Sequence, residues 1–176
     1  DERVSKTSEK LGGASVLINN AGISKPSPFP EITDKNWAEV IDVNLGIAFR
    51  LTRSFWSQLS ENNGSVVNLA SFASKRSTLF GNNSSYVAAK HAISGLTRAT
   101  AFEGATQGIR VNAVAPGTVD TELIRSVHDA DTRNKILKFI PQNRFADTSE
   151  IADVIAFLAS PRASHICGEI VNINGG

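Results

Sequence analysis

The fold is first indicated at Ser15-Val16-Leu17-Ile18-Asn19, a short apolar run with Gly12-Gly13 before it and Asn20-Ala21-Gly22 after it. Short runs of branched apolar residues bounded by glycine are typical of buried strands. Three more such runs follow along the chain. They are Ser65–Ala70, Ile109–Val114 and Glu169–Ile173, so the sequence predicts four strands.

Helices are predicted between these strands, because apolar residues recur there at three- and four-residue spacing. Strands that alternate with helices in this way form repeated βαβ units, which place the strands parallel in one sheet. We therefore predict an α/β fold in a single domain over 1–176. The predicted helices are Asp34–Leu59, with Thr33 or Asp34 as cap; Ser84 or Ser85 to about Phe102; and Glu150–Leu158, with Asp147 or Thr148 as cap.

Composition narrows the classes of partner. The chain carries 18 basic and 17 acidic side chains without blocks of one sign, which argues against a nucleic-acid or membrane-surface partner. With Cys167 as the single cysteine and no Cys/His cluster, we expect no intrachain disulfide and no metal site. The sequence has neither a run of about 20 apolar residues nor a signal peptide, so we expect a cytoplasmic protein.

Tyr86 and Lys90 are four residues apart on a predicted helix, hence on one face of it. A free phenol titrates near roughly pH 10, and a cation close by would favour the phenolate and bring its pKa down toward neutrality. Such a pair could act as a general acid and base. Taken alone, the spacing more often marks two solvated neighbours on a helix.

Ligands of parallel α/β sheets bind outside the carboxyl ends of the strands, so the residues there are candidate site residues. Ser71 follows the second predicted strand, where its hydroxyl could hydrogen-bond a substrate carbonyl. Asn20-Ala21-Gly22 and Pro116-Gly117 follow the first and third strands and could approach a flat cofactor closely. Each of these segments could equally be an ordinary turn.

In this order and spacing, the segments resemble the short-chain dehydrogenase/reductase family from about Gly13 to Gly176. The family resemblance implies a Rossmann-type three-layer sandwich, here with about four strands, and an NAD or NADP cofactor. The matching stretches are Val16–Gly22, Asp42-Val43-Asn44-Leu45-Gly46, Ser71, Tyr86–Lys90, Arg110–Gly117 and Asn172-Ile173-Asn174-Gly175-Gly176.

This resemblance also implies roles for single residues. Tyr86 would be the acid/base, Lys90 its partner and a contact to the cofactor ribose, and Ser71 the hydroxyl that orients the substrate. Asn44 would hold a proton-relaying water at a local distortion of the long helix, although it could also be a polar residue on a solvated face. The expected cofactor contacts are Asn20, Ala21, Gly22, Tyr86, Lys90, Pro116, Gly117, Val119 and Thr121.

Two features depart from the family pattern. The spacing from Ser71 to Tyr86 is two residues longer than usual, which leaves Ser74 as a second candidate. The glycine-rich phosphate-binding turn and the strands around it do not occur in these 176 residues. We therefore expect the first strand to expose an apolar edge, either in an incomplete chain or in a short form that pairs with another copy.

The sequence predicts an oxidoreductase that interconverts a small-molecule carbonyl and alcohol by hydride transfer. The main alternative is a non-catalytic binding or assembly module, and an isomerase or dehydratase is a third. Family members commonly form dimers or tetramers through the two long helices. The irregular stretch Gly117–Asp147 is predicted to be a mobile lid, with Leu123–Ile140 over the substrate.

Overall fold

The four strands form one parallel sheet in the order β1-β2-β3-β4. This computed structural model describes residues 6, 10, 12–78, 81–127 and 129–176. The prediction of a parallel sheet is confirmed. The strands are β1 (Val16–Asn19), β2 (Ser65–Leu69), β3 (Arg110–Pro116) and β4 (Ile170–Ile173).

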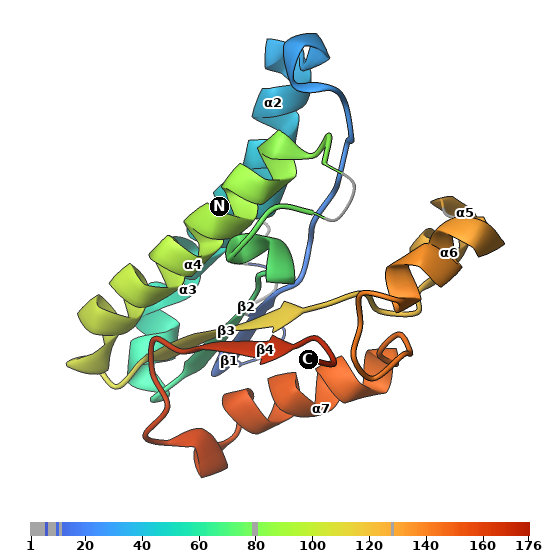
Figure 1. Cartoon of the computed structure of the whole chain (residues 1–176). Coiled ribbons are helices and arrows are strands. Elements are labelled where there is room, and N and C mark those ends of the chain that lie inside the picture. Colours follow the sequence, from blue (N-terminus) through green and yellow to red (C-terminus); the bar gives the residue numbers. More distant parts are fainter. Residues whose placement is uncertain (1–5, 7–9, 11, 79–80, 128) are drawn as a thin grey trace.

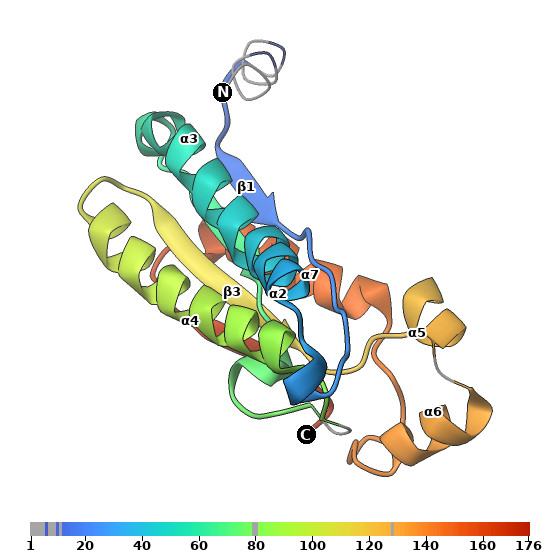
Figure 2. The same ribbon diagram turned by 90° about the horizontal axis from the view of Figure 1, so that it is seen from above.

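Helices cover both faces of this sheet, which gives the predicted three layers (Figure 1). On one face, α3 (Ile47–Glu61) packs on β1 and α4 (Ser84–Ala105) packs on β3; α7 (Thr148–Ala159) packs on β2 and β3 from the other face. Seen from above, α3 and α4 run side by side, and α2 (Asp34–Ile41) continues the line of α3 (Figure 2).

Each face of the sheet has its own core. Val66 packs with Leu59 and Ile109 beneath α3 and α4, whereas the next residue, Val67, packs with Leu158 beneath α7. Successive side chains of a strand point to opposite faces, so β2 contributes apolar side chains to both cores. The continuous apolar pattern that predicted a buried strand is explained by this double coverage.

The predicted long helix is divided in two. Between α2 and α3, the segment η2 (Asp42–Gly46) is a π-helical turn. Thr33 caps the start of α2 through a hydrogen bond from Asn36 N, as predicted. Asn83 stands at the N-cap position of α4, so the predicted caps Ser84 and Ser85 both lie inside the helix, which continues past the predicted end at Phe102 to Ala105.

The lid region is more regular than predicted. It contains α5 (Glu122–Val127) and α6 (Ala130–Leu137), so the expectation of an irregular stretch was wrong. Both helices are too short to show an apolar period, yet Thr121 and Asp129 accept hydrogen bonds from backbone N–H groups in their first turns. Val119 and Ala146 form an isolated bridge, which joins the two ends of the lid at its base.

β1 is an edge strand of the described sheet, and two of its apolar side chains are exposed. Val16 is 46% and Ile18 38% exposed, as expected for a strand that lacks a neighbour on one side. The remaining short elements are the 3-10 turns η1 (Phe29–Glu31), η3 (Phe72–Ser74) and η4 (Pro161–Ala163). Within the described part of the chain, no helix is both long and apolar enough to cross a membrane.

Candidate active site

Ser71, Tyr86 and Lys90 lie together at the carboxyl end of β2. Lys90 Nζ is 5.6 Å from the centroid of the Tyr86 ring and donates a 2.6 Å hydrogen bond to the carbonyl of Leu69, the last residue of β2. The Ser71 hydroxyl lies near enough to the Tyr86 phenol to lower its pKa. The first two turns of α4 and the exit of β2 thus bring three polar side chains to one point.

The two candidate serines differ in what their hydroxyls contact. Ser74 Oγ donates a 2.6 Å hydrogen bond to the backbone carbonyl of Ser71, which closes the turn η3. Ser71 Oγ accepts from Ala73 N at 3.2 Å and also lies near the phenol of Tyr86. This geometry favours Ser71 over Ser74 as the hydroxyl beside the phenol.

Burial, rather than the Tyr86–Lys90 contact, sets the pKa values of this pair. Burial raises the pKa of the Tyr86 phenol, and the nearby Ser71 hydroxyl opposes this only in part. Burial also lowers the pKa of the Lys90 ammonium to about 8. The sequence predicted that the Lys90 cation lowers the pKa of the Tyr86 phenol. That pKa is instead raised, because desolvation disfavours the phenolate of Tyr86 as well as the ammonium of Lys90.

Asn44 lies inside the π-helical turn and is 2% exposed, which rules out a solvated helix face. Its Nδ2 donates to Val40 O at 2.9 Å and to Ile23 O at 2.8 Å, so it ties the helix to the loop after β1. Its Oδ1 is buried and has no hydrogen-bond partner among the described residues. That oxygen remains available as an acceptor at the site.

The loop after β1 fits a close-lying cofactor. A Cβ at Gly22 would come within 2.8 Å of Asn44 Oδ1 and 3.5 Å of Lys90 Nζ, so the backbone passes next to both polar groups. An ammonium has three N–H donors, and Leu69 O takes one from Lys90, which leaves donors for ribose hydroxyls. Asn20 and Ala21 are exposed on the same loop.

The expected cofactor contacts after β3 already have partners within the chain. Gly117 N donates to Ile173 O at 2.9 Å, and the side chain of Val119 packs on the core beneath α7. Thr121 Oγ1 accepts from Ile124 N at the start of α5. Pro116 is the last residue of β3, so Pro116, Gly117, Val119 and Thr121 all lie at or after its carboxyl end. Their contact with a cofactor stays a prediction.

A buried polar network next to the site was missed from the sequence. Asn19 Nδ2 donates to Asn68 Oδ1 at 2.8 Å and to Thr52 Oγ1 at 3.1 Å, and Asn68 Nδ2 donates to Thr97 Oγ1 at 2.9 Å. It links β1 and β2 to both covering helices. The signal was an asparagine inside each apolar run, which must find a partner when it is buried.

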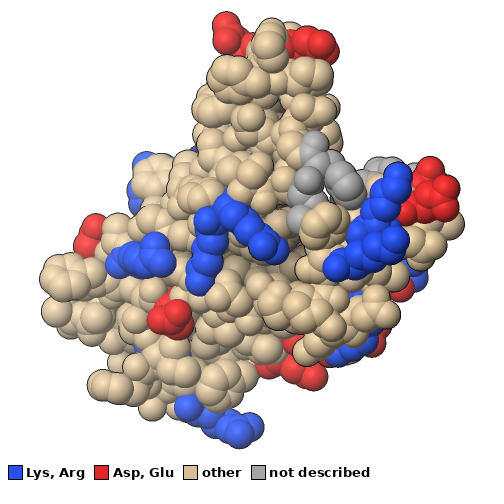
Figure 3. Space-filling view, in the orientation of Figure 1, with Lys and Arg blue, Asp and Glu red and all other residues tan. Residues whose placement is uncertain are grey.

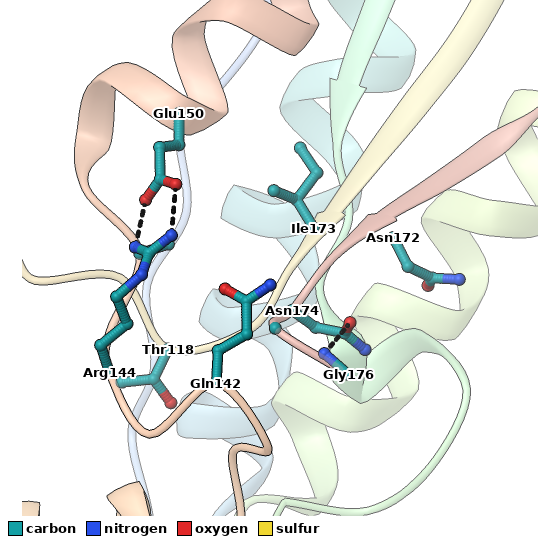
Figure 4. A pocket seen from close by; sticks show the side chains of 10 residues that line it. Thr118, Gln142, Arg144, Glu150, Asn172, Ile173, Asn174 and Gly176 are labelled. Atoms are coloured by element: carbon teal, nitrogen blue, oxygen red, sulfur yellow. Dashed lines mark hydrogen bonds and ion pairs between the residues drawn. The ribbon is translucent and has the colours of Figure 1, made fainter.

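A separate polar pocket of about 280 Å³ lies at the carboxyl end of β4 (Figure 4). Arg144 and Glu150 form a bidentate ion pair on its wall, at 2.7 Å for both contacts. This pair, with the hydrogen bond from Asp147 N, lowers the pKa of Glu150 to about 2. None of Ser71, Tyr86 and Lys90 lines this pocket.

Among the described residues, no group of three or more His, Cys, Asp or Glu side chains could hold a metal.

Known proteins similar to this chain are reductases and dehydrogenases. A family model described as enoyl-(acyl carrier protein) reductase matches residues 1–176. Acetoacetyl-CoA reductase of Shinella zoogloeoides is 37% identical over 99% of this chain and 72% of that protein. 3-Oxoacyl-(acyl-carrier-protein) reductase of Escherichia coli (strain K12) is 34% identical over 97% of this chain and 69% of that protein.

Two solved structures have the same fold. A protein from Sinorhizobium meliloti 1021, described as a short-chain alcohol dehydrogenase, gives a TM-score of 0.92 at 34% identity, over 98% of this chain and 69% of that one. A protein from Agrobacterium tumefaciens, described as a 2-deoxy-D-gluconate 3-dehydrogenase with bound NADP, gives 0.87 at 39% identity, over 92% of this chain and 66% of that one. The chain thus spans between 66% and 72% of the length of these relatives. Because the family model matches all 176 residues and the relatives are this similar, the chain belongs to the short-chain dehydrogenase/reductase family.

Proposed function

We propose that this chain carries the catalytic residues of an NAD(P)-dependent oxidoreductase that interconverts a carbonyl and an alcohol. The observation that supports this most is the meeting of the Ser71 hydroxyl, the Tyr86 phenol and the Lys90 ammonium at the exit of β2. All four similar proteins named above are described as reductases or dehydrogenases.

In the direction of reduction, Tyr86 is the proton donor to the carbonyl oxygen. Burial raises the pKa of its phenol, so the group is protonated at neutral pH, which is the state that a proton donor requires. The Ser71 hydroxyl donates a hydrogen bond to the same oxygen and stabilises the charge that develops there. A bound nicotinamide supplies the hydride.

Lys90 and Asn44 support this proton transfer. When Tyr86 has lost its proton, the nearby Lys90 ammonium stabilises the phenolate, and its remaining N–H groups bind ribose hydroxyls. The unpaired Oδ1 of Asn44 provides a hydrogen-bond acceptor on the side of the site that faces Gly22. The backbone at Asn20, Ala21, Gly22, Pro116 and Gly117 would line the cofactor, and Val119 and Thr121 would be further contacts.

A 3-oxoacyl thioester is the first substrate class to test, with NADPH as the first cofactor. Two of the relatives are named for reduction of such thioesters, and one of the solved structures contains NADP. Lys and Arg side chains gather on the face that carries η3 and the lid helices (Figure 3). They give an acidic handle, such as the phosphates of an acyl carrier, a favourable approach.

The test is Tyr86→Phe in the protein expressed from its complete reading frame. Tyr86 is the single tyrosine of the chain, and phenylalanine keeps its ring but removes the proton. We expect NADPH oxidation with acetoacetyl-CoA to fall by at least about a hundredfold, because an acid/base group contributes that much. Circular dichroism serves as the fold control. Turnover that survived the substitution would overturn the assignment of Tyr86.

A second candidate function is a non-catalytic assembly module. It is favoured by large apolar side chains exposed on the long helices, where Phe102 is 85%, Phe49 45% and Trp37 41% exposed. Quenching of Trp37 and Trp56 fluorescence by NADH or NADPH separates the two functions. Saturable micromolar quenching supports the oxidoreductase, and its absence supports the module. Turnover without net hydride transfer would instead indicate an isomerase or dehydratase.

A further inference from the structure

The π-helical turn that holds Asn44 has an unusual hydrogen bond and a defined position. Ile47 N–H donates to the carbonyl of Asp42, five residues back, where a regular α-helix would pair residues four apart. Such single π turns are rare and are often found at functional sites. Something in the chain must therefore favour the π form over continuous α-helix at this point.

An ion pair spans this turn on its outer side. Arg50 Nη1 and Nη2 donate to Asp42 Oδ1 and Oδ2 at 2.6 and 2.9 Å, a bidentate arrangement between residues eight positions apart. In a regular α-helix, eight steps of about 100° would leave the two side chains about 80° apart around the axis. Because the π turn absorbs one residue, it brings them onto the same face, so the ion pair forms in the π geometry.

Gly46 lies directly under this ion pair. A Cβ at this position would collide with Asp42 Oδ1 and come within 3.0 Å of Arg50 Nη1. The glycine is therefore required by the pair that crosses above it, since its φ of −59° is ordinary for any helical residue. The Arg50 guanidinium also holds the pKa of the Asp42 carboxyl below its usual range, so the pair stays charged at neutral pH.

We propose that Asp42, Gly46 and Arg50 form a clamp that selects the π-helical turn and thereby positions Asn44. The expected effect of the clamp on turnover rests on the proposed function, which puts Asn44 at the active site. Asp42 and Arg50 are exposed and act through Asn44 as positioning residues. If the turn reverted to α-helix, Asn44 would rotate and lose its hydrogen bond to Ile23 O, which anchors the loop at Gly22.

The primary test measures structure rather than activity. Hydrogen–deuterium exchange of backbone amides over 42–50 is compared in the wild type, Asp42→Ala and Arg50→Met. Arg53→Met is the matched control, because Arg53 lies on the same helix and stacks on Phe49 outside the clamp. We expect exchange to accelerate about threefold to tenfold in the two clamp variants, as suits one exposed ion pair, and not in the control. Unchanged protection in both clamp variants would overturn the proposal.

A second test uses Gly46→Ala in two backgrounds. In the wild type, the added methyl group collides with the Asp42 carboxylate, so kcat with NADPH should fall and the KM for NADPH should rise, because Asn44 anchors the loop at Gly22 that we place along the cofactor. In Asp42→Ala, the carboxylate is gone and the same substitution should have no further effect. Equal losses in both backgrounds would show that the two residues do not act together, which contradicts a clamp.

These outcomes are separable from failure of the proposed function. If Tyr86→Phe retains activity, the oxidoreductase assignment fails, yet the exchange measurements still decide whether the clamp holds the turn. If Tyr86→Phe is inactive while Asp42→Ala keeps both full kcat and full protection, the enzyme assignment stands and the clamp is rejected.

Discussion

At the scale of single residues, burial gives the candidate site its chemistry. Lys90 is 4% exposed, and its ammonium has one strong acceptor, the carbonyl of Leu69. Desolvation thus lowers the pKa of Lys90 to about 8 and raises that of Tyr86, so the two pKa values move apart and both groups are shifted toward their neutral forms. Burial therefore keeps the proton on the phenol, which is the form that a proton donor requires.

Lys90 should make stability depend on pH in the alkaline range. Its folded pKa of about 8 lies below the usual 10.5, so between these values the unfolded chain binds more protons and a rise in pH favours folding. Relative to Lys90→Met, we expect the wild type to gain on the order of 2 kcal/mol in free energy of unfolding between about pH 8 and 9.5. Urea unfolding at several pH values measures this. A difference that does not vary with pH would contradict the lowered pKa.

The residue types of the site could be predicted from the sequence, but their environment could not. The four-residue spacing places Tyr86 and Lys90 on one face of a helix, and a residue after a strand, such as Ser71, comes to the ligand-binding edge. The direction of the Tyr86 pKa depends on burial by distant parts of the chain, which no local pattern records. The link from Asn19 to Asn68 was missed for the same reason, since it joins two strands.

At the scale of elements, the strands were predictable as short apolar runs bounded by glycine, and the long helices from their apolar period. Runs such as Ser65–Ala70 carry apolar residues on both faces, and α2 and α3 have one sustained apolar face. The π turn was implied by the family resemblance alone, because one inserted residue hardly disturbs an apolar pattern. The lid helices α5 and α6 span only 6 and 8 residues, too few for an apolar period to stand out.

Asp120 should hold both lid helices at their base. It pairs with Arg125 of α5 at 3.2 Å and with Arg133 of α6 at 3.8 Å, and its carboxylate is one-third exposed. We expect Asp120→Asn to raise the KM for substrate about twofold to tenfold with little change in kcat, because partly exposed pairs contribute modestly. Steady-state kinetics check this, with Asp131→Asn on α6 as control.

Ionic strength offers an independent check on the same pairs. Salt screens such charges, so the KM of the wild type should rise with added NaCl and that of Asp120→Asn should rise less. Parallel salt dependence in the two proteins would show that Asp120 does not hold the lid.

At the scale of the whole molecule, the exposed apolar side chains indicate association. Phe102 on α4 is 85% exposed, and Phe49 on α3 is 45% exposed. Large aromatic side chains are enriched in interfaces between subunits. We propose that copies of the protein assemble as dimers or tetramers through α3 and α4.

Phe102→Glu should weaken this assembly. A charge placed within an apolar contact must be desolvated without a partner, so we expect the molar mass in solution to fall toward that of a monomer at micromolar concentration. Light scattering after gel filtration measures the mass, with Phe139→Glu as the control because Phe139 is 60% exposed on the lid, away from these helices. An unchanged mass for Phe102→Glu would place the interface elsewhere.

The bridge between Val119 and Ala146 also has a consequence for how substrate preference can diverge. Because the two ends of the lid meet in a single pair of residues, the stretch between them begins and ends at almost the same place in space. Such a segment can be replaced by one of different length or composition while the strands beneath it keep their register. New specificities can then arise by recombination at this base, with the proton-transfer chemistry inherited intact.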